Sequence, residues 1–96
     1  MPVTDNTLER RFELDVEGDV AYLAYEVVGD RLVFRHTFVP RASRNRGVGA
    51  LLVEAALEAA SSRGLSVVPE CSFARGYLEQ RPEVAARVKL DAPGTT

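Results

Sequence analysis

The chain has little cysteine and no long apolar run. Cys71 is the only cysteine among 96 residues, so no intramolecular disulfide can form, as is usual for proteins of a reducing compartment. The first residues, MPVTDNTLERR, lack the apolar stretch of a signal peptide. No segment approaches the roughly 20 apolar residues that a membrane-spanning helix needs. The sequence therefore predicts a cytoplasmic protein that does not enter a membrane.

An excess of charge of either sign is also lacking. The chain has 12 Lys and Arg against 14 Asp and Glu, a formal net charge of −2, which argues against nucleic acid or an anionic membrane as a partner. The arginines are unevenly placed, however, because Arg35, Arg41, Arg44 and Arg46 lie close together. A local basic site in an otherwise acidic chain suits a small anionic ligand.

The first part of the chain predicts strands. A chain of this length forms one domain, which we expect at residues 10–90, with a flexible N-terminus at 1–9 and a flexible tail at 91–96. RFELDVE alternates apolar and charged residues, as a half-buried strand does. VAYLAYEVV is apolar on both faces and predicts a more central strand, and RLVFRHTFV predicts a third. Two Gly-Asp connections between them indicate antiparallel hairpins.

The hydrophobic period then changes to that of a helix. Apolar residues recur at helical spacing from 47 to 63, and Gly64 is well placed to end this helix. LSVVPE predicts a fourth strand, parallel to the third. A helix capped by Ser72 and a short helix beginning at Pro82 complete the chain. The expected fold is α+β with a mixed sheet: a three-stranded antiparallel meander, a crossover helix, a parallel strand and a C-terminal helix.

The segment RNRGVG, residues 44–49, opens the long helix and has two readings. The free N–H groups of a helix start bind anions, and glycine lets a phosphate approach the backbone. Alternatively, Gly47 and Gly49 help to start a helix among solvated arginines. A Rossmann fingerprint is excluded because Leu52 stands where its third glycine belongs, and a Walker A loop is excluded because Gly-Lys-Ser/Thr is absent.

Several segments together carry a resemblance. RNRGVG fits the Arg/Gln-x-x-Gly-x-Gly/Ala motif of the GNAT superfamily of N-acetyltransferases, and HTFV, VVPECSFA and GYLEQRPEV extend the match over residues 10–90. The chain resembles the small single-domain members of that superfamily. It departs from them at Gly76, where many relatives have a basic residue, at Arg81, where a histidine often precedes the proline, and at Val84, where an aromatic residue is common.

The resemblance implies acetyl-CoA as co-substrate and no metal. The pantetheine arm would enter between the third and fourth strands and bind the backbone around Phe38 and Val39. The remaining implied residues, which would bind the pyrophosphate, are Arg44, Asn45, Arg46, Gly47, Val48, Gly49 and Ala50.

Three residues are candidates for the chemistry. Cys71 precedes a helix, whose N-terminus favours a reactive thiolate; it is a nucleophile, a lining of the thioester pocket, or a small core residue. His36 alternates with Phe34 and Phe38 and points inward, either as a base for the incoming amine or as a hydrogen-bonded core residue. Tyr77 protonates the departing CoA thiolate, as a tyrosine does in many larger relatives, or packs in the core.

The leading hypothesis is an acetyl-CoA-dependent N-acetyltransferase that acts on a primary amine. A CoA-binding module without significant turnover is the alternative, and an interaction domain with a basic loop is a third. The acceptor is left open, and the chain is expected to be a monomer or a homodimer.

Overall fold

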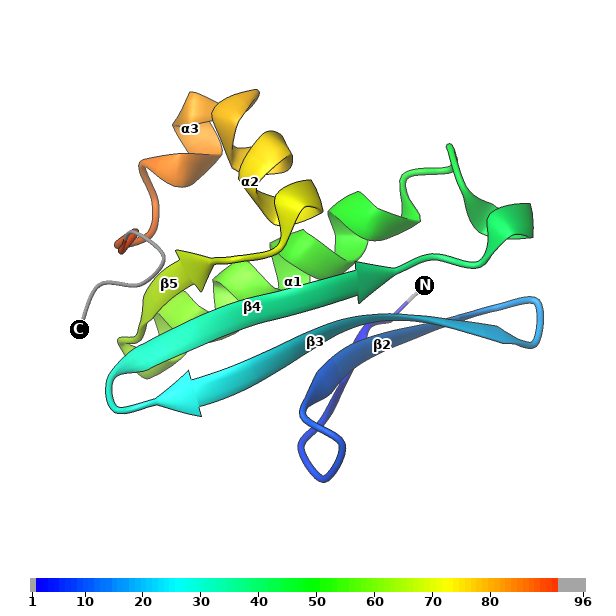
Figure 1. Ribbon diagram of the computed structural model, residues 1–96, viewed down its shortest axis with the longest axis horizontal. Coiled ribbons are helices and arrows are strands. Elements are labelled where there is room, and N and C mark those ends of the chain that lie inside the picture. Colours follow the sequence, from blue (N-terminus) through cyan, green and yellow to red (C-terminus); the bar gives the residue numbers. More distant parts are fainter. Residues whose placement is uncertain (1, 92–96) are drawn as a thin grey trace.

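Strands occupy the first part of the chain and helices most of the rest (Figure 1). The structure is a computed structural model that describes residues 2–91, so residues 92–96 of the predicted tail lie outside the described part. The elements are β1 Thr4–Asn6, β2 Arg11–Val16, β3 Asp19–Val28, β4 Arg31–Phe38, a 3-10 turn Arg41–Ser43, α1 Val48–Arg63, β5 Ser66–Pro69, α2 Ser72–Glu79 and α3 Pro82–Ala85.

The strands form one mixed sheet in the order β1-β2-β3-β4-β5. β1 to β4 are antiparallel neighbours, and β5 lies parallel to β4 with α1 in the connection. Gly18 and Gly29 adopt φ of 90° and 62° in the hairpin turns, a conformation that glycine adopts without strain. The predicted α+β fold is confirmed, including its meander and its central strand β3.

The N-terminal segment differs from its prediction. Flexibility is predicted for residues 1–9, but Thr4–Asn6 form β1 at the edge of the sheet. The carboxylate of Asp5 accepts hydrogen bonds from the Tyr25 hydroxyl at 2.7 Å and from the Arg63 guanidinium at 2.9 Å. The prediction is therefore wrong for these residues, because distant partners hold a strand too short to show an apolar alternation.

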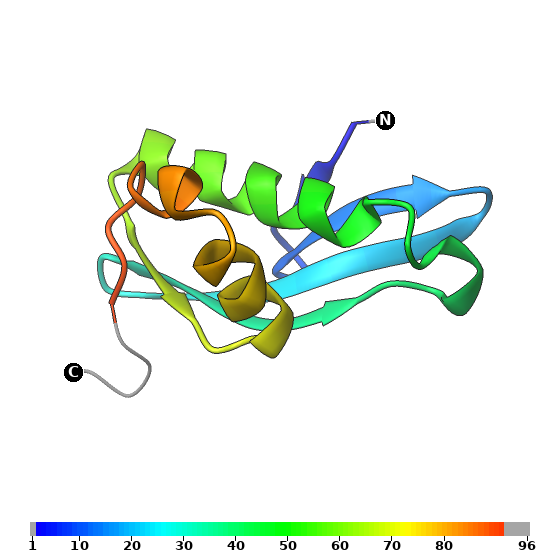
Figure 2. The same cartoon turned by 90° about the horizontal axis from the view of Figure 1, so that it is seen from above.

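The helix α1 covers one face of the sheet (Figure 2). Leu52, Val53, Ala56 and Ala60 are fully buried against the strands, and the small alanines let the helix approach closely. Gly64 ends α1 with φ of 67°, as predicted. Among the described residues no helix covers the opposite face of the sheet, which we call the open face (Figure 2). None of the helices in residues 2–91 is long and apolar enough to cross a membrane.

A β-bulge in β4 changes which face its later side chains occupy. Phe34 is the partner of Tyr25 and His36 is the partner of Ala24, so Arg35 is the additional residue on β4. A bulge interrupts the alternation of side chains along a strand. Phe34 is therefore fully buried under α1, whereas His36 is exposed. The prediction that His36 points inward is wrong, because it assumes an uninterrupted strand.

The two C-terminal helices begin close to their predicted positions. Ser72 is the first residue of α2 and Cys71 takes the capping position, so the predicted cap lies one residue too far along the chain. Pro82 begins α3, as predicted, where its missing N–H costs nothing.

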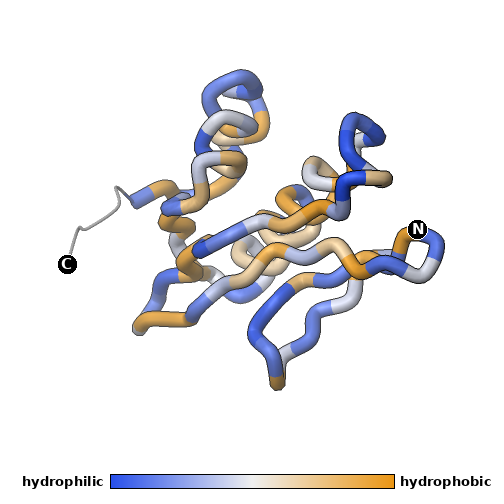
Figure 3. The backbone as a smooth tube through the Cα atoms, turned by 45° about the vertical axis from the view of Figure 1, so that its right-hand side comes forward, coloured by the Kyte–Doolittle hydropathy of each residue, from blue (hydrophilic) through white to orange (hydrophobic). Residues whose placement is uncertain are grey.

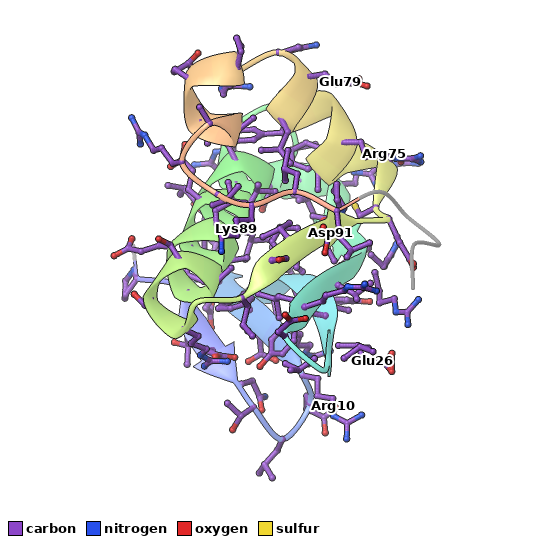
Figure 4. The ribbon with its side chains drawn as sticks, turned by 90° about the vertical axis from the view of Figure 1, so that its left-hand side faces the viewer. Arg10, Glu26, Arg75, Glu79, Lys89 and Asp91 are labelled. Carbon is purple, nitrogen blue, oxygen red and sulfur yellow. The ribbon has the colours of Figure 1, made fainter. Side chains whose placement is uncertain are left out.

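The segment after α3 covers the outer edge of β5. The Val67 N–H donates to the Lys89 carbonyl at 2.7 Å, and the Asp91 N–H donates to the Val67 carbonyl at 2.8 Å. Figure 4 shows the segment that carries Lys89 and Asp91 beside β5. The Arg31 guanidinium adds an ion pair to Asp91 at 3.2 Å. Asp91, the first residue of the predicted tail, therefore takes part in a short addition to the sheet.

Candidate functional site

The two parallel strands separate beyond their shared register. β4 and β5 pair from Arg31–Phe34 with Ser66–Pro69, and the Cys71 N–H then donates to the Phe34 carbonyl at 3.0 Å. β4 continues to Phe38 without β5 beside it, while the chain after β5 turns into α2. This fork leaves one edge of β4 available to a ligand.

A cleft of about 510 Å³ begins at this edge and ends at the start of α1. The loop that borders it is hydrophilic (Figure 3). The predicted residues His36, Phe38, Val39, Arg44, Asn45, Gly47, Val48, Gly49 and Ala50 line the cleft together with Thr37, Ser43 and Phe73. Three predicted site residues, Arg46, Cys71 and Tyr77, are not among the lining residues.

The start of α1 offers backbone donors to the cleft. Gly47 takes the capping position with φ of 78°, no side chain caps the helix, and its first turn has no acidic residue. The first N–H groups of a helix have no partner within it, and the helix dipole favours an anion there. Asn45 also has a positive φ, 65°, so the loop turns sharply. The Arg44 Nε donates to the Val39 carbonyl at 3.1 Å, which ties the loop to the end of β4.

Glycine stands at positions 47 and 49 of the motif for different structural reasons. A side chain at Gly47 would meet no atom within 4 Å, so it is the positive φ that favours glycine there. At Gly49 a Cβ would lie 2.6 Å from Cζ of Phe73. The ring of Phe73 therefore packs directly on the first turn of α1, and it also borders a second hollow, of about 370 Å³, beside Tyr77 and Arg81.

Cys71 lies at the fork itself. Its side chain is buried, with a relative exposure of 7%, and its Sγ is 3.2 Å from the hydroxyl of Thr37. Because of the bulge, Thr37 points to the α1 side of the sheet while its neighbours His36 and Phe38 point to the open face. The structure thus places a thiol and a hydroxyl in contact next to the cleft.

Tyr77 is oriented toward α1. Its hydroxyl donates a hydrogen bond to the Glu54 carboxylate, and the Arg81 guanidinium lies 4.2 Å from the ring centroid. Burial, together with the hydrogen bond to Glu54 and its charge, raises the pKa of Tyr77 to about 12. The hydroxyl therefore stays protonated at neutral pH, as a proton donor must be.

Charged side chains cluster on the open face beside His36. The Arg35 guanidinium binds the Glu26 carboxylate at 2.7 Å and the Glu70 carboxylate at 2.6 Å. The hydrogen bond and charge of Arg35 hold the pKa of Glu26 below its usual range. In residues 2–91 no three His, Cys, Asp or Glu side chains gather as a metal site would require.

Sequence reasoning missed three lining residues. Thr37 and Phe73 lie within the segments HTFV and VVPECSFA that carry the resemblance. The sequence therefore marked both segments, but it assigned no role to these two residues. Ser43 is a buried polar residue, with 3% exposure, in a loop where only the arginines and glycines carried a signal.

A family model for GCN5-related N-acetyl-transferase matches residues 11–88. The chain belongs to this family. Protein NATD1 from Mus musculus is 37% identical over 76 residues, which cover 76% of this chain and 69% of that protein. Protein NATD1 from Gallus gallus has the same identity and coverage, and the Homo sapiens protein is 37% identical with 67% of its length covered. Family membership supports an acetyltransferase-like function.

Proposed function

We propose that the chain is an acetyl-CoA-dependent N-acetyltransferase that moves an acetyl group to a primary amine. The observation that carries this proposal is a continuous cleft that runs from the free edge of β4 to the uncapped start of α1. An elongated ligand with an anionic middle and a hydrogen-bonding arm suits such a cleft. CoA has both, and its acetyl thioester supplies the activated acyl group.

The loop before α1 and its first turn would bind the pyrophosphate. Arg44 and Asn45 border the cleft, and the backbone from Gly47 to Ala50 offers N–H groups and the positive end of the helix dipole. Arg46 lies outside the lining residues, so its charge would act through the local potential rather than by contact.

The edge of β4 would hold the pantetheine arm. Phe38 and Val39 line the cleft beyond the part of β4 that pairs with β5. The Val39 carbonyl already accepts a hydrogen bond from Arg44, so the other backbone groups of this segment would bind the arm. The same kind of strand N–H group stabilises the oxyanion that develops when an amine attacks a carbonyl. Cys71 and Thr37 would border the reacting end.

His36 is the proposed base. It lines the cleft and is exposed on the open face, so an amine arriving from that face would meet it and lose a proton to it. Tyr77 keeps its proton at neutral pH, but its hydroxyl is bonded to Glu54. To protonate the thiolate, the Tyr77 hydroxyl would therefore have to exchange its hydrogen bond to Glu54 for one to the CoA sulfur.

Thermal unfolding with and without CoA tests the proposed cleft. A ligand at 100 times its Kd adds about 2.7 kcal/mol to the free energy of unfolding, which raises Tm by roughly 10–20 °C in a domain of this size. Arg44→Gln should reduce the shift, and Arg75→Gln, an exposed arginine on α2 outside the cleft, should not. Absence of any shift with CoA in the unaltered chain would contradict the proposal.

A CoA-binding module without significant turnover is the second candidate. The observation that favours it is that neither Cys71 nor Tyr77 lines the cleft. This candidate predicts a CoA-dependent shift in Tm without acetylation of any amine in a broad panel. The measurement is the mass of the amine products formed from acetyl-CoA.

Incubation with acetyl-CoA alone separates two routes of transfer. An increase in intact mass by one acetyl group, lost in Cys71→Ala, would support an acetyl-cysteine intermediate. No increase in mass, with full activity in Cys71→Ala, would support direct transfer. A cytoplasmic location and a monomeric or homodimeric state stay predictions.

A further inference from the structure

The fork between β4 and β5 is closed at one end by contacts in the backbone and on both faces of the sheet. The Cys71 N–H donates to the Phe34 carbonyl at 3.0 Å. On the α1 side, the Cys71 Sγ lies 3.2 Å from the Thr37 hydroxyl, and on the open face the Arg35 guanidinium binds the Glu70 carboxylate at 2.6 Å. Each contact joins β4 to the segment after β5, so the strands are held together at this end (Figure 1).

The order of residues along β4 gives the cleft a direction. The loop and the start of α1, where the pyrophosphate is proposed to bind, form one end of the cleft, and Phe38 and Val39 follow. Thr37 lines the cleft one residue further from the loop, and Cys71 lies directly behind it. A group attached to the far end of the pantetheine arm would therefore meet Thr37 first and Cys71 next. We call these two residues the closing pair.

The closing pair is backed by the core. Thr37 is the partner of Leu23 on β3, whose side chain is fully buried under α1. Cys71 is buried and belongs to the same apolar core. Because protein cores are packed as densely as organic crystals, an additional methylene cannot enter one without strain. The closing pair therefore forms a firm end to the fork.

We propose that the closing pair sets the size of the acyl group, admitting acetyl and rejecting acyl groups that are longer by one or more methylenes. This inference rests on the proposed function, in which the pantetheine arm lies along β4. The methyl group of an acetyl thioester would end against Thr37 and Cys71, and the third carbon of a propionyl thioester would overlap with them. His36 points to the open face and Thr37 to the α1 side, so an acyl chain on the α1 side leaves the open face to the amine.

Binding is measured first, with unreactive ligands. S-ethyl-CoA and S-propyl-CoA are thioethers whose alkyl groups match acetyl and propionyl in carbon number, and neither can acylate Cys71. One methylene changes recognition in a close-fitting pocket by about 10–200-fold. We therefore expect calorimetry to give a Kd for S-ethyl-CoA that is lower by about tenfold or more. Equal Kd values for the two thioethers would overturn the proposal and leave the CoA cleft supported.

Substitutions at the two ends of the cleft locate the discrimination. Cys71→Ala removes one heavy atom from the closing pair, and Ser43→Ala removes one from a lining residue at the loop end of the same cleft. Cys71→Ala should bring the ratio of the two Kd values toward one, because the third carbon then has room, while Ser43→Ala should preserve the ratio. Thr37→Ala, the second variant of the closing pair, should act as Cys71→Ala does. Circular dichroism establishes that each variant is folded. A ratio that neither closing-pair variant changes, or that Ser43→Ala lowers equally, would overturn the proposal.

Turnover separates this proposal from the proposed function. With one amine as acceptor, kcat/KM for acetyl-CoA should exceed that for propionyl-CoA by about tenfold or more. Transfer of both acyl groups with equal kcat/KM would overturn the role of the closing pair and leave the transferase function intact. Discrimination between the thioethers without acetylation of any amine would support the closing pair and count against the transferase function. Absence of binding by either thioether would overturn both.

Discussion

Gly49 and Gly76 offer a matched pair of glycine-to-alanine substitutions. Both lie in helices, and neither has a positive φ. A Cβ added at Gly76 meets nothing within 4 Å, whereas a Cβ at Gly49 would lie 2.6 Å from Cζ and 2.9 Å from Cε2 of Phe73. The two substitutions therefore share the change in helix propensity and differ in the overlap with one ring.

The magnitudes follow from these contacts. Alanine is favoured over glycine in a helix interior by about 0.8–1 kcal/mol, and 1 kcal/mol shifts Tm by about 4–8 °C in a domain of this size. Gly76→Ala should therefore raise Tm by about that amount. At Gly49 the overlap costs about 1 kcal/mol, the low end for overpacking, because the Phe73 side chain is 45% exposed and its ring can turn outward. Gly49→Ala should therefore leave Tm nearly unchanged.

A double-mutant cycle isolates the ring. Gly49→Ala is measured by urea denaturation in the unaltered chain and in Phe73→Ala, where we expect its stabilising effect to appear in full, with a coupling of about 1 kcal/mol. If Gly49→Ala and Gly76→Ala stabilise the chain equally, and Phe73→Ala changes neither effect, the packing of Phe73 on α1 is refuted.

Three further predictions concern the core and the buried tyrosines. Leu52→Ala should lower the free energy of unfolding by about 2–5 kcal/mol, and the half-exposed Leu51 provides a control whose alanine variant costs less than about 1 kcal/mol in the same denaturation assay. Burial and a neighbouring carboxylate raise the pKa of both Tyr25 and Tyr77 to about 12. These values exceed the unfolded value of about 10, so the contribution of both tyrosines to the free energy of unfolding should be constant below pH 10 and fall between about pH 10 and 12. A free energy of unfolding that does not change between pH 10 and 12 would contradict this. Tyr77→Phe should cost about 0.5–1.5 kcal/mol through the lost bond to Glu54 and make the alkaline fall less steep.

Much of the fold could be predicted from local patterns. The strand at Arg11–Val16 shows a clear alternation, and α1 shows a helical period that ends at a glycine. The segment RNRGVG, whose charges and glycines carry a local signal, belongs to the loop that lines the cleft, and its binding of a pyrophosphate stays a prediction. Thr4–Asn6 gave no such signal, because this strand depends on Asp5 contacting residues that are distant in the sequence.

The direction of side chains at the site could not be predicted. His36 was expected to point inward because a strand alternates, and only the pairing with β3 shows that Arg35 is an additional residue. The packing of Phe73 on α1 could likewise not be predicted, because its contact with Gly49 joins two helices that β5 separates along the chain. Both features depend on contacts between elements, which neither periodicity nor composition encodes.

The short pairing of Lys89–Asp91 with β5 has a consequence for solubility. An uncovered strand edge presents unpaired N–H and C=O groups that another chain can extend. On β5, the donor and the acceptor of Val67 are both occupied from within the chain, and at the opposite border of the sheet β1 is only three residues long. Both edges of the sheet are therefore protected from pairing with another chain. Removing the residues from Lys89 onward would expose the edge of β5, and copies of the protein could then associate through this strand.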